Sequence, residues 1–135
     1  MDVPPAQRGL VVDWGGVLTD GLDAAIAGWA DGDGVDLATY HDVIRDWLGP
    51  GLARTTWLNP IHALERGELA VPDFEVRLAA ELSRRSGRHL DPEGLVDRMF
   101  QQFQHAPDMA ALVRRARAAG LRTALLSNSW GNEYP

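Results

Sequence analysis

The chain has 135 residues, of which 45% are apolar and 24% charged, which is the usage of an ordinary globular domain and excludes a disordered chain. Its formal net charge of -6 argues against a non-specific nucleic-acid surface, and the absence of cysteine excludes disulfides, zinc–thiolate sites and thiol nucleophiles. No apolar run approaches the ~18 residues of a membrane span, and the amino terminus lacks a secretory pattern, so we expect a cytoplasmic protein without membrane or nucleic-acid partners.

Residues 9–20 read GLVVDWGGVLTD and join a short β-branched run to a pair of glycines. Residues 10–12 are too few for a helix and are ended by the glycines, so we predict a buried strand. Asp13 then stands at the carboxyl end of this strand, where glycine lets the backbone approach a ligand, as in the crevice of an open α/β sheet. A plain turn built from Asp and Gly is the alternative.

The middle of the chain reads as helical. Apolar residues repeat at helical spacing at residues 20–29, 35–48, 61–66, 72–86, 91–103 and 107–119. The acidic segment 31–36 fits a calcium loop poorly, because Asp36 replaces the required glycine, and is interpreted as a solvated turn. We expect residues 51–60 to be irregular.

Residues typical of helix starts and ends define the bounds of two of these helices more closely. Pro72 begins one that ends near Gly87, and Asp91 is expected to be the N-cap of the next, with Pro92 at its first position. The predicted inward faces of the last two helices comprise Leu95, Met99, Phe100 and Phe103, and Met109, Leu112, Val113 and Ala116. Met99 and the two phenylalanines are interpreted as core residues.

Residues 121–126 predict a second strand, which runs directly into Ser127, Asn128 and Ser129. A helix, a glycine and a strand make half of a doubly wound unit. We therefore expect the carboxyl ends of the two strands to lie side by side, with Asp13 next to these small polar residues.

These two segments, in this order, resemble motifs one and two of the haloacid dehalogenase-like (HAD) hydrolase superfamily. The similarity is greatest to its subfamily IA members with a helical cap, such as the amino-terminal phosphatase-like domain of soluble epoxide hydrolases, and residues 65–69 (ERGEL) and 107–129 also resemble that group. The resemblance implies a mostly helical α/β protein with a partial Rossmann-like core of parallel strands. Residues 1–20 and 106–135 would form the core, and residues 21–105 the helical cap.

The resemblance further implies that Asp13 attacks phosphorus and forms an aspartyl-phosphate that water hydrolyses. The implied substrate-binding residues are Trp14, Gly15, Gly16, Ser127 and Asn128. Of these, Ser127 and Asn128 would also assist catalysis by holding the transferring group. Mg²⁺ would be bound by the Asp13 carboxylate and the main-chain carbonyl of Gly15. The expected function is therefore a Mg²⁺-dependent phosphatase of a small phosphorylated metabolite.

Two departures from the family pattern leave alternatives open. Phosphatases of the superfamily usually carry an acid at the position of Gly15, and losing general acid help typically slows a reaction about 10²–10⁴-fold. Dehalogenases lack that acid, so hydrolysis of a carbon–halogen bond by Asp13 is the second candidate. The chain also ends at Pro135, before the family's later lysine and acidic pair, so we expect a truncated and inactive chain whose exposed sheet favours a homo-oligomer. A non-catalytic binding or assembly module and an unrelated small helical protein are the remaining readings.

Overall fold

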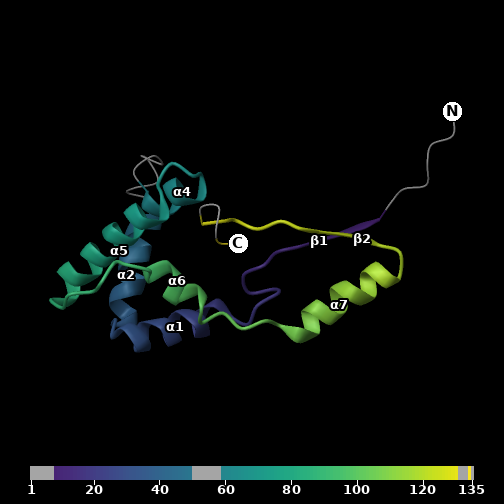
Figure 1. Cartoon of the computed structure of the whole chain (residues 1–135), viewed down its shortest axis with the longest axis horizontal. Helices are drawn as coiled ribbons and strands as arrows, with labels where there is room; N and C mark the ends of the chain where they lie inside the picture. Colours follow the sequence, from purple (N-terminus) through teal and green to yellow (C-terminus); the bar gives the residue numbers. More distant parts are fainter. Residues whose placement is uncertain (1–7, 50–58, 131–133, 135) are drawn as a thin grey trace.

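The computed structural model describes residues 8–49, 59–130 and 134. Its elements are β1 (Gly9–Val12), α1 (Leu22–Asp33), α2 (Leu37–Leu48), α4 (Pro60–Glu65), α5 (Val71–Ser86), α6 (Leu95–Phe100), α7 (Pro107–Ala118) and β2 (Arg122–Leu125). Five helices, α1, α2, α4, α5 and α6, gather at one end of an elongated molecule, and α7 lies with the two strands at the other (Figure 1). The protein is thus a mostly helical α/β chain with a small parallel sheet, as the sequence predicts.

The two strands pair in parallel, from Gly9 opposite Arg122 to Val12 opposite Leu125. The Leu126 N–H donates to the Val12 carbonyl at 2.9 Å and extends the pairing by one step. The prediction that the strands' carboxyl ends lie side by side is therefore confirmed.

The prediction that β1 is buried is wrong for the residues that the structure describes. Val11 is 61% exposed, and Leu125, which lies opposite Val12 in β2, is 53% exposed. Parallel sheets are normally covered on both faces, but here the helices that form the core lie at the other end of the molecule (Figure 1).

Helix α7 lies against β2 but buries none of its residues. Met109, Val113 and Ala116 are half-buried and Leu112 is 42% exposed, so the predicted inward face is present but not enclosed. Gly120, with φ of 86°, then reverses the chain into β2.

The hydrophobic core lies within the helical end. Its buried residues are Trp29, Ala30, Tyr40, Val43, Ile61, Ala63, Leu64, Leu69, Phe74, Leu78, Ala79, Leu82, Leu95, Val96 and Met99. The helices predicted at residues 35–48, 61–66 and 72–86 are confirmed. Asp36 caps α2 by accepting the Thr39 N–H, and Gly87 ends α5 in the left-handed conformation. Of the expected irregular segment 51–60, all but Asn59 and Pro60 lie outside the described residues.

Helix α1 is longer than the sequence suggested, because it continues to Asp33 and ends at Gly34, which has a left-handed φ of 65°. The expected solvated acidic turn is therefore partly helical. The Asp33 carboxylate accepts the Trp29 indole N–H at 2.9 Å and forms an ion pair with Arg98 of α6. Asp33 is thus a structural residue that joins α1 to α6.

Helix α6 begins later than predicted. Asp91 accepts the Glu93 N–H at 3.0 Å within a turn, and Gly94, with φ of 66°, is the N-cap instead. The Val96 N–H donates to Oε1 of Glu75 in α5 at 2.9 Å. The carboxylate of Glu75 in α5 therefore accepts a backbone N–H at the start of α6, which is the role that the sequence predicted for Asp91.

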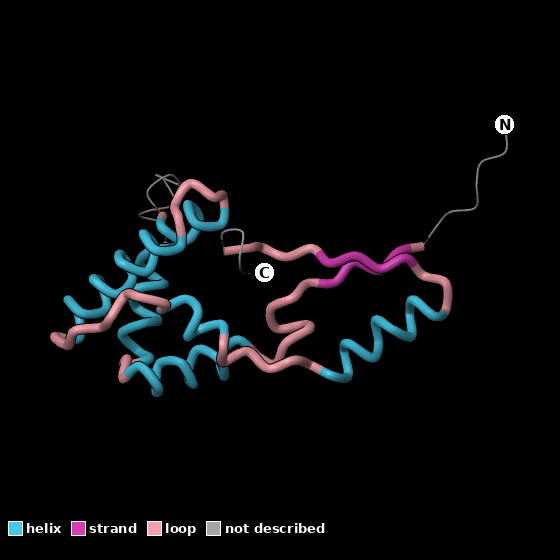
Figure 2. Tube along the Cα trace, in the orientation of Figure 1, coloured by secondary structure: helices cyan, strands magenta, loops and turns pink. Residues whose placement is uncertain are grey.

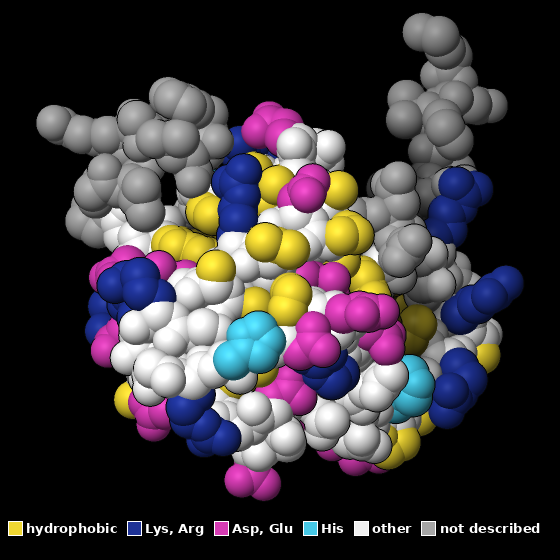
Figure 3. All heavy atoms as spheres, turned by 60° about the vertical axis from the view of Figure 1, so that its left-hand side comes forward, with side chains coloured by type: hydrophobic (Ala, Val, Ile, Leu, Met, Phe, Trp, Pro, Cys, Tyr) yellow, Lys and Arg dark blue, Asp and Glu magenta, His cyan; other side chains and the backbone are white. Residues whose placement is uncertain are grey.

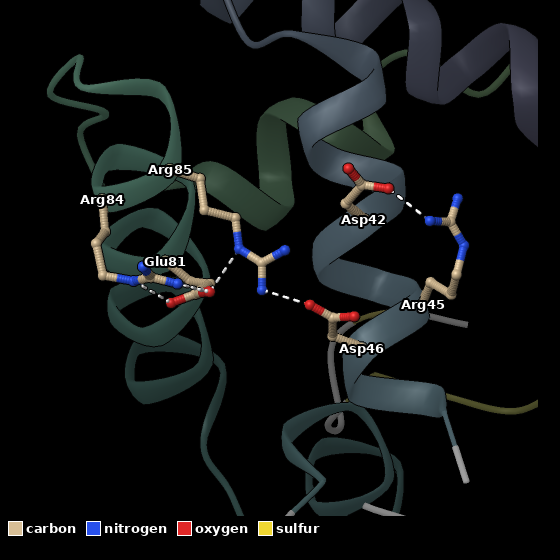
Figure 4. A network of polar contacts seen from close by, with 6 residues as sticks. All are labelled: Asp42, Arg45, Asp46, Glu81, Arg84 and Arg85. Carbon is tan, nitrogen blue, oxygen red and sulfur yellow. Dashed lines mark hydrogen bonds and ion pairs between the residues drawn. The ribbon is translucent and has the colours of Figure 1, made fainter. Parts of the chain in front are cut away.

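Ion pairs join the outer surfaces of the helices. Glu81 of α5 accepts from both Arg84 and Arg85, and Arg85 reaches Asp46 of α2 (Figure 4). On the face seen in Figure 3, acidic and basic side chains are interspersed around apolar ones. None of the described helices is both long and apolar enough to cross a membrane.

Candidate active site

A tight turn follows β1 and presents Asp13. The carbonyl of Trp14 accepts the N–H groups of Val17, Leu18 and Thr19 at 3.2, 2.9 and 3.3 Å. Gly16 takes a φ of 74°, which favours glycine, and its N–H donates to Thr19 Oγ1 at 2.9 Å. Asp13 is exposed at the mouth of this turn.

The turn is fixed to the segment that leaves α6. The Asp20 N–H donates to the Gln104 carbonyl, and the Ala106 N–H to the Leu18 carbonyl, both at 2.8 Å. Thr19 forms an antiparallel bridge with His105 and is 3% exposed. The two loops therefore pass from the strand end to the helical end side by side (Figure 2).

A cavity of about 410 Å³ lies beside Asp13. Its polar or glycine lining comprises Asp13, Gly15, Tyr40, Ser127 and Asn128. Its apolar and aromatic lining comprises Trp14, Leu22, Ile26, Met99, Phe100, Phe103 and Trp130. The structure thus brings Asp13 together with Ser127 and Asn128, from the ends of the two paired strands, around one space.

The polar groups at the strand ends have defined partners. Asp13 Oδ1 accepts the Trp14 N–H at 2.7 Å, so the backbone N–H of Trp14, a predicted substrate-binding residue, already has an acceptor within the protein. Ser127 Oγ donates to the Asn128 carbonyl at 3.3 Å, and Asn128 Nδ2 donates to Glu65 Oε1 of α4 at 3.4 Å. Gly16 is not among the residues that line the cavity.

The donor set fits a hydrated Mg²⁺ ion better than an ion enclosed by protein. The groups in place are the carboxylate of Asp13 and the carbonyl of Gly15, both from residues that line the cavity. No cluster of three or more His, Cys, Asp or Glu residues that could hold a metal occurs within residues 8–49, 59–130 and 134. Mg²⁺ is often bound through one or two carboxylates together with waters and substrate phosphates, so the Asp13 carboxylate and the Gly15 carbonyl would be the residues' contribution to such a site.

The space next to Gly15 is limited. A Cβ atom built on Gly15 would lie 3.3 Å from Cδ2 of Leu22, closer than an ordinary contact. An acidic side chain at this position would therefore require Leu22 to move.

Aromatic rings form much of the cavity wall. The Trp14 ring stacks on Phe100 at 5.9 Å between centroids and lies 5.3 Å from Phe103. Phe100 also contacts Trp130 at 5.8 Å. Met99 is 1% exposed, as expected of a core residue, whereas Phe100 and Phe103 are only half-buried.

Of the aromatic residues that line the cavity, Trp14 was predicted as a substrate-binding residue, whereas Tyr40, Phe100, Phe103 and Trp130 were not predicted to belong to the site. Phe100 and Phe103 were interpreted as core because their spacing fits a buried helical stripe, although Phe103 lies beyond the end of α6. A signal was present in the tryptophans, since Trp14 directly follows Asp13 and Trp130 directly follows Ser129. A tryptophan beside each polar segment points to an aromatic boundary of the same site.

Tyr40 contributes a neutral hydroxyl-bearing side chain to the cavity lining. Burial raises its pKa to about 12, and the phenol is protonated at neutral pH with or without this shift. Its ring also contacts Trp29 edge-on, with 5.4 Å between centroids. The residue therefore connects the cavity wall to the helical core.

The solved structures that this chain resembles include one described as a predicted HAD-like family hydrolase from Porphyromonas gingivalis. The two share 24% identity with a TM-score of 0.53, over 91% of this chain and 52% of the other. This chain thus spans about half the length of that protein. No protein-family model matches the chain, and no match was found among curated proteins. The parallel strands, the helical end and this similarity together show that the chain has a HAD-like α/β fold.

Proposed function

We propose that this chain is a member of the HAD-like hydrolase superfamily and that Asp13 is the nucleophile of a Mg²⁺-dependent phosphatase acting on a small phosphorylated molecule. The observation that carries the proposal is the meeting of Asp13 with Ser127 and Asn128 at one cavity, at the carboxyl ends of paired parallel strands. Similarity of fold to a HAD-like hydrolase supports it. The activity of that longer protein comes to this chain only as part of the proposal.

In the proposed reaction, Asp13 Oδ2 attacks the phosphorus atom and the bond from phosphorus to the leaving oxygen breaks. The hydrogen bond from the Trp14 N–H to Oδ1 holds the carboxylate in one orientation for this attack. Ser127 and Asn128 bind the oxygens of the transferring group. Gly15 has no proton to donate, so the leaving oxygen takes its proton from water.

Water then hydrolyses the aspartyl-phosphate, which releases inorganic phosphate and restores Asp13. Mg²⁺, held by the Asp13 carboxylate and the Gly15 carbonyl, would supply positive charge next to the phosphoryl oxygens. The helices that border the cavity would limit the access of bulk water.

The test is the Mg²⁺-dependent hydrolysis of 4-nitrophenyl phosphate by the chain and by Asp13→Asn. Removing the nucleophile should lower turnover by about 10³-fold or more. Asp31→Asn is the matched control, because Asp31 is an exposed carboxylate of α1 that does not line the cavity. Equal turnover by the chain and Asp13→Asn would refute the assignment of the nucleophile.

A specific observation favours hydrolysis of a carbon–halogen bond as the second candidate. Gly15 offers no acid, and Leu22 restricts the space for one, but a departing halide needs no proton. Chloride release from a 2-chloroalkanoate that is lost in Asp13→Asn, without phosphate release from any ester, would support this reaction. A chain that catalyses neither reaction would instead fit a non-catalytic binding or assembly module.

A further inference from the structure

The cavity beside Asp13 separates into two chemically different parts. Asp13, Gly15, Ser127 and Asn128 follow the two strands and supply oxygen and nitrogen groups. The remaining lining consists of aliphatic and aromatic side chains, in which the indole N–H groups of Trp14 and Trp130 and the hydroxyl of Tyr40 are the strong hydrogen-bonding groups. A ligand held at Asp13 would therefore extend its other end into an apolar, aromatic space.

The charged residues of the cavity lining restrict which organic groups the cavity can bind. Within the described part of the chain, the lining includes no Lys, Arg or His, and Asp13 is its one carboxylate. The Tyr40 phenol is protonated and neutral at physiological pH, as in an ordinary tyrosine. An organic group with its own carboxylate or further phosphate would meet no opposite charge there and would lose hydration without compensation.

Aromatic rings hold this wall in place. Trp14 packs against Phe100 and Phe103, which lie 5.3 Å from each other. Rings that already pack together keep their orientation, so a planar aromatic ligand can stack on them at a small cost in side-chain entropy. The volume of about 410 Å³ falls within the range of about 300–1,000 Å³ typical of small-molecule sites.

We propose that the substrate of this site is a monoester whose organic group is an uncharged aromatic ring, stacked on Trp14, Phe100 and Phe103, with its phosphoryl end at Asp13. This inference rests on the proposed function for the phosphoryl end and on the aromatic wall for the organic end. The polyhydroxylated organic group of a sugar phosphate is disfavoured by the same wall, because its hydroxyl groups would lose hydration without compensation.

The experiment measures the binding of 2-naphthol, the uncharged product of such an ester, by calorimetry and by quenching of tryptophan fluorescence. Glycerol is the matched aliphatic alcohol, and 2-naphthyl phosphate and glycerol 3-phosphate form the phosphorylated pair. We expect 2-naphthol to bind and glycerol not to bind. The affinity for 2-naphthol should fall about tenfold in Phe103→Ala, which removes a stacking ring.

Two further variants control for misfolding and for effects of mutations outside the cavity. Phe103→Leu preserves most of the side-chain volume and should weaken binding in the same direction, even if the alanine variant folds poorly. Leu112→Ala removes an exposed apolar side chain of α7 outside the cavity and should leave the affinity within about twofold. Naphthol affinity that is unchanged in both Phe103 variants, or that falls equally in Leu112→Ala, would overturn the proposal.

Failure of this inference can be told apart from failure of the proposed phosphatase. Naphthol binding that depends on Phe103 but accompanies no turnover would support the aromatic site and contradict the phosphatase. Turnover that depends on Asp13 and prefers glycerol 3-phosphate to 2-naphthyl phosphate would support the phosphatase and contradict the aromatic substrate.

Discussion

Glu75 offers the sharpest test of how the helical end shapes the cavity. Its side chain is 7% exposed, and Oε1 accepts the Val96 N–H at 2.9 Å. Val96 is the second residue of α6, where backbone N–H groups have no partner within the helix, and the N-cap Gly94 has no side chain to supply one. Glu75 therefore stabilises the start of the helix that carries Met99 and Phe100 to the cavity.

The expected cost of Glu75→Ala follows from these contacts. Leaving the Val96 N–H buried without an acceptor costs about 1–3 kcal/mol. Loss of one buried methylene group adds about 0.8 kcal/mol at most, so the free energy of unfolding should fall by about 2–4 kcal/mol. Glu75→Gln keeps an acceptor oxygen within reach and should cost about 1 kcal/mol.

Urea unfolding followed by circular dichroism at 222 nm measures these differences. The control is Glu93→Ala, which removes an exposed carboxylate from the turn just before α6 and should change stability by less than about 0.5 kcal/mol. If Glu75→Ala were no less stable than Glu93→Ala, the proposed role of Glu75 at the start of α6 would be refuted.

Three further predictions concern other parts of the molecule. Arg98→Met removes the partner of Asp33, whose side chain is only 14% exposed, and should lower the free energy of unfolding by about 1–3 kcal/mol in the same assay. Hydrogen bonds from arginines lower the pKa of Glu81 from 4.5 to about 2, so its stabilisation should be present above pH 4.5 and lost as the pH falls toward 2. Because Glu81 lies at the surface, we expect this loss to be only about 1 kcal/mol, and it should be absent in Glu81→Gln. Gly15→Asp should raise Asp13-dependent phosphatase turnover only when combined with Leu22→Ala, which makes room for the new side chain; equal turnover of the single and double variants would contradict the crowding argument.

Elements with strong local signals were predictable from the sequence. Helix α5 follows from its apolar spacing, its early proline and Gly87 at its end, and both strands follow from short apolar runs cut off by small residues. The start of α6 was not predictable, because Asp91 and Pro92 form a good local cap signal. Gly94 and the distant Glu75 set the boundary instead, and that contact joins residues 21 positions apart.

Burial could not be derived from the same patterns. The apolar run of β1 and the inward face of α7 have the composition of buried segments, yet Val11 and Leu112 are exposed in the described structure. The spacing of apolar residues indicates which face of a helix or strand is apolar and can pack against another element. Whether another element covers that face depends on the arrangement of the whole molecule.

The candidate site was predictable only in its polar half. Asp13, Ser127 and Asn128 follow strands and carry a family resemblance, whereas the aromatic wall is assembled from the turn after β1, the end of α6 and the segment after β2. Helical spacing alone does not distinguish a ring that fills a core from one that borders a cavity. Only the structure shows that Phe103 stands beyond the end of its helix and faces Trp14.

The aromatic residues of the cavity wall differ in their contacts with the hydrophobic core. A mutation of each ring is therefore expected to affect ligand binding and protein stability to different degrees. Phe100 contacts Trp130, which lies 5.4 Å from the fully buried Phe74 of α5, so a change at Phe100 or Trp130 would disturb the helical core as well as the cavity. Phe103 lies at the edge of this group of rings, where its ring contacts are with Trp14 and Phe100. Its removal should therefore weaken binding of an aromatic ligand more than it lowers stability, whereas removal of Phe100 should do both.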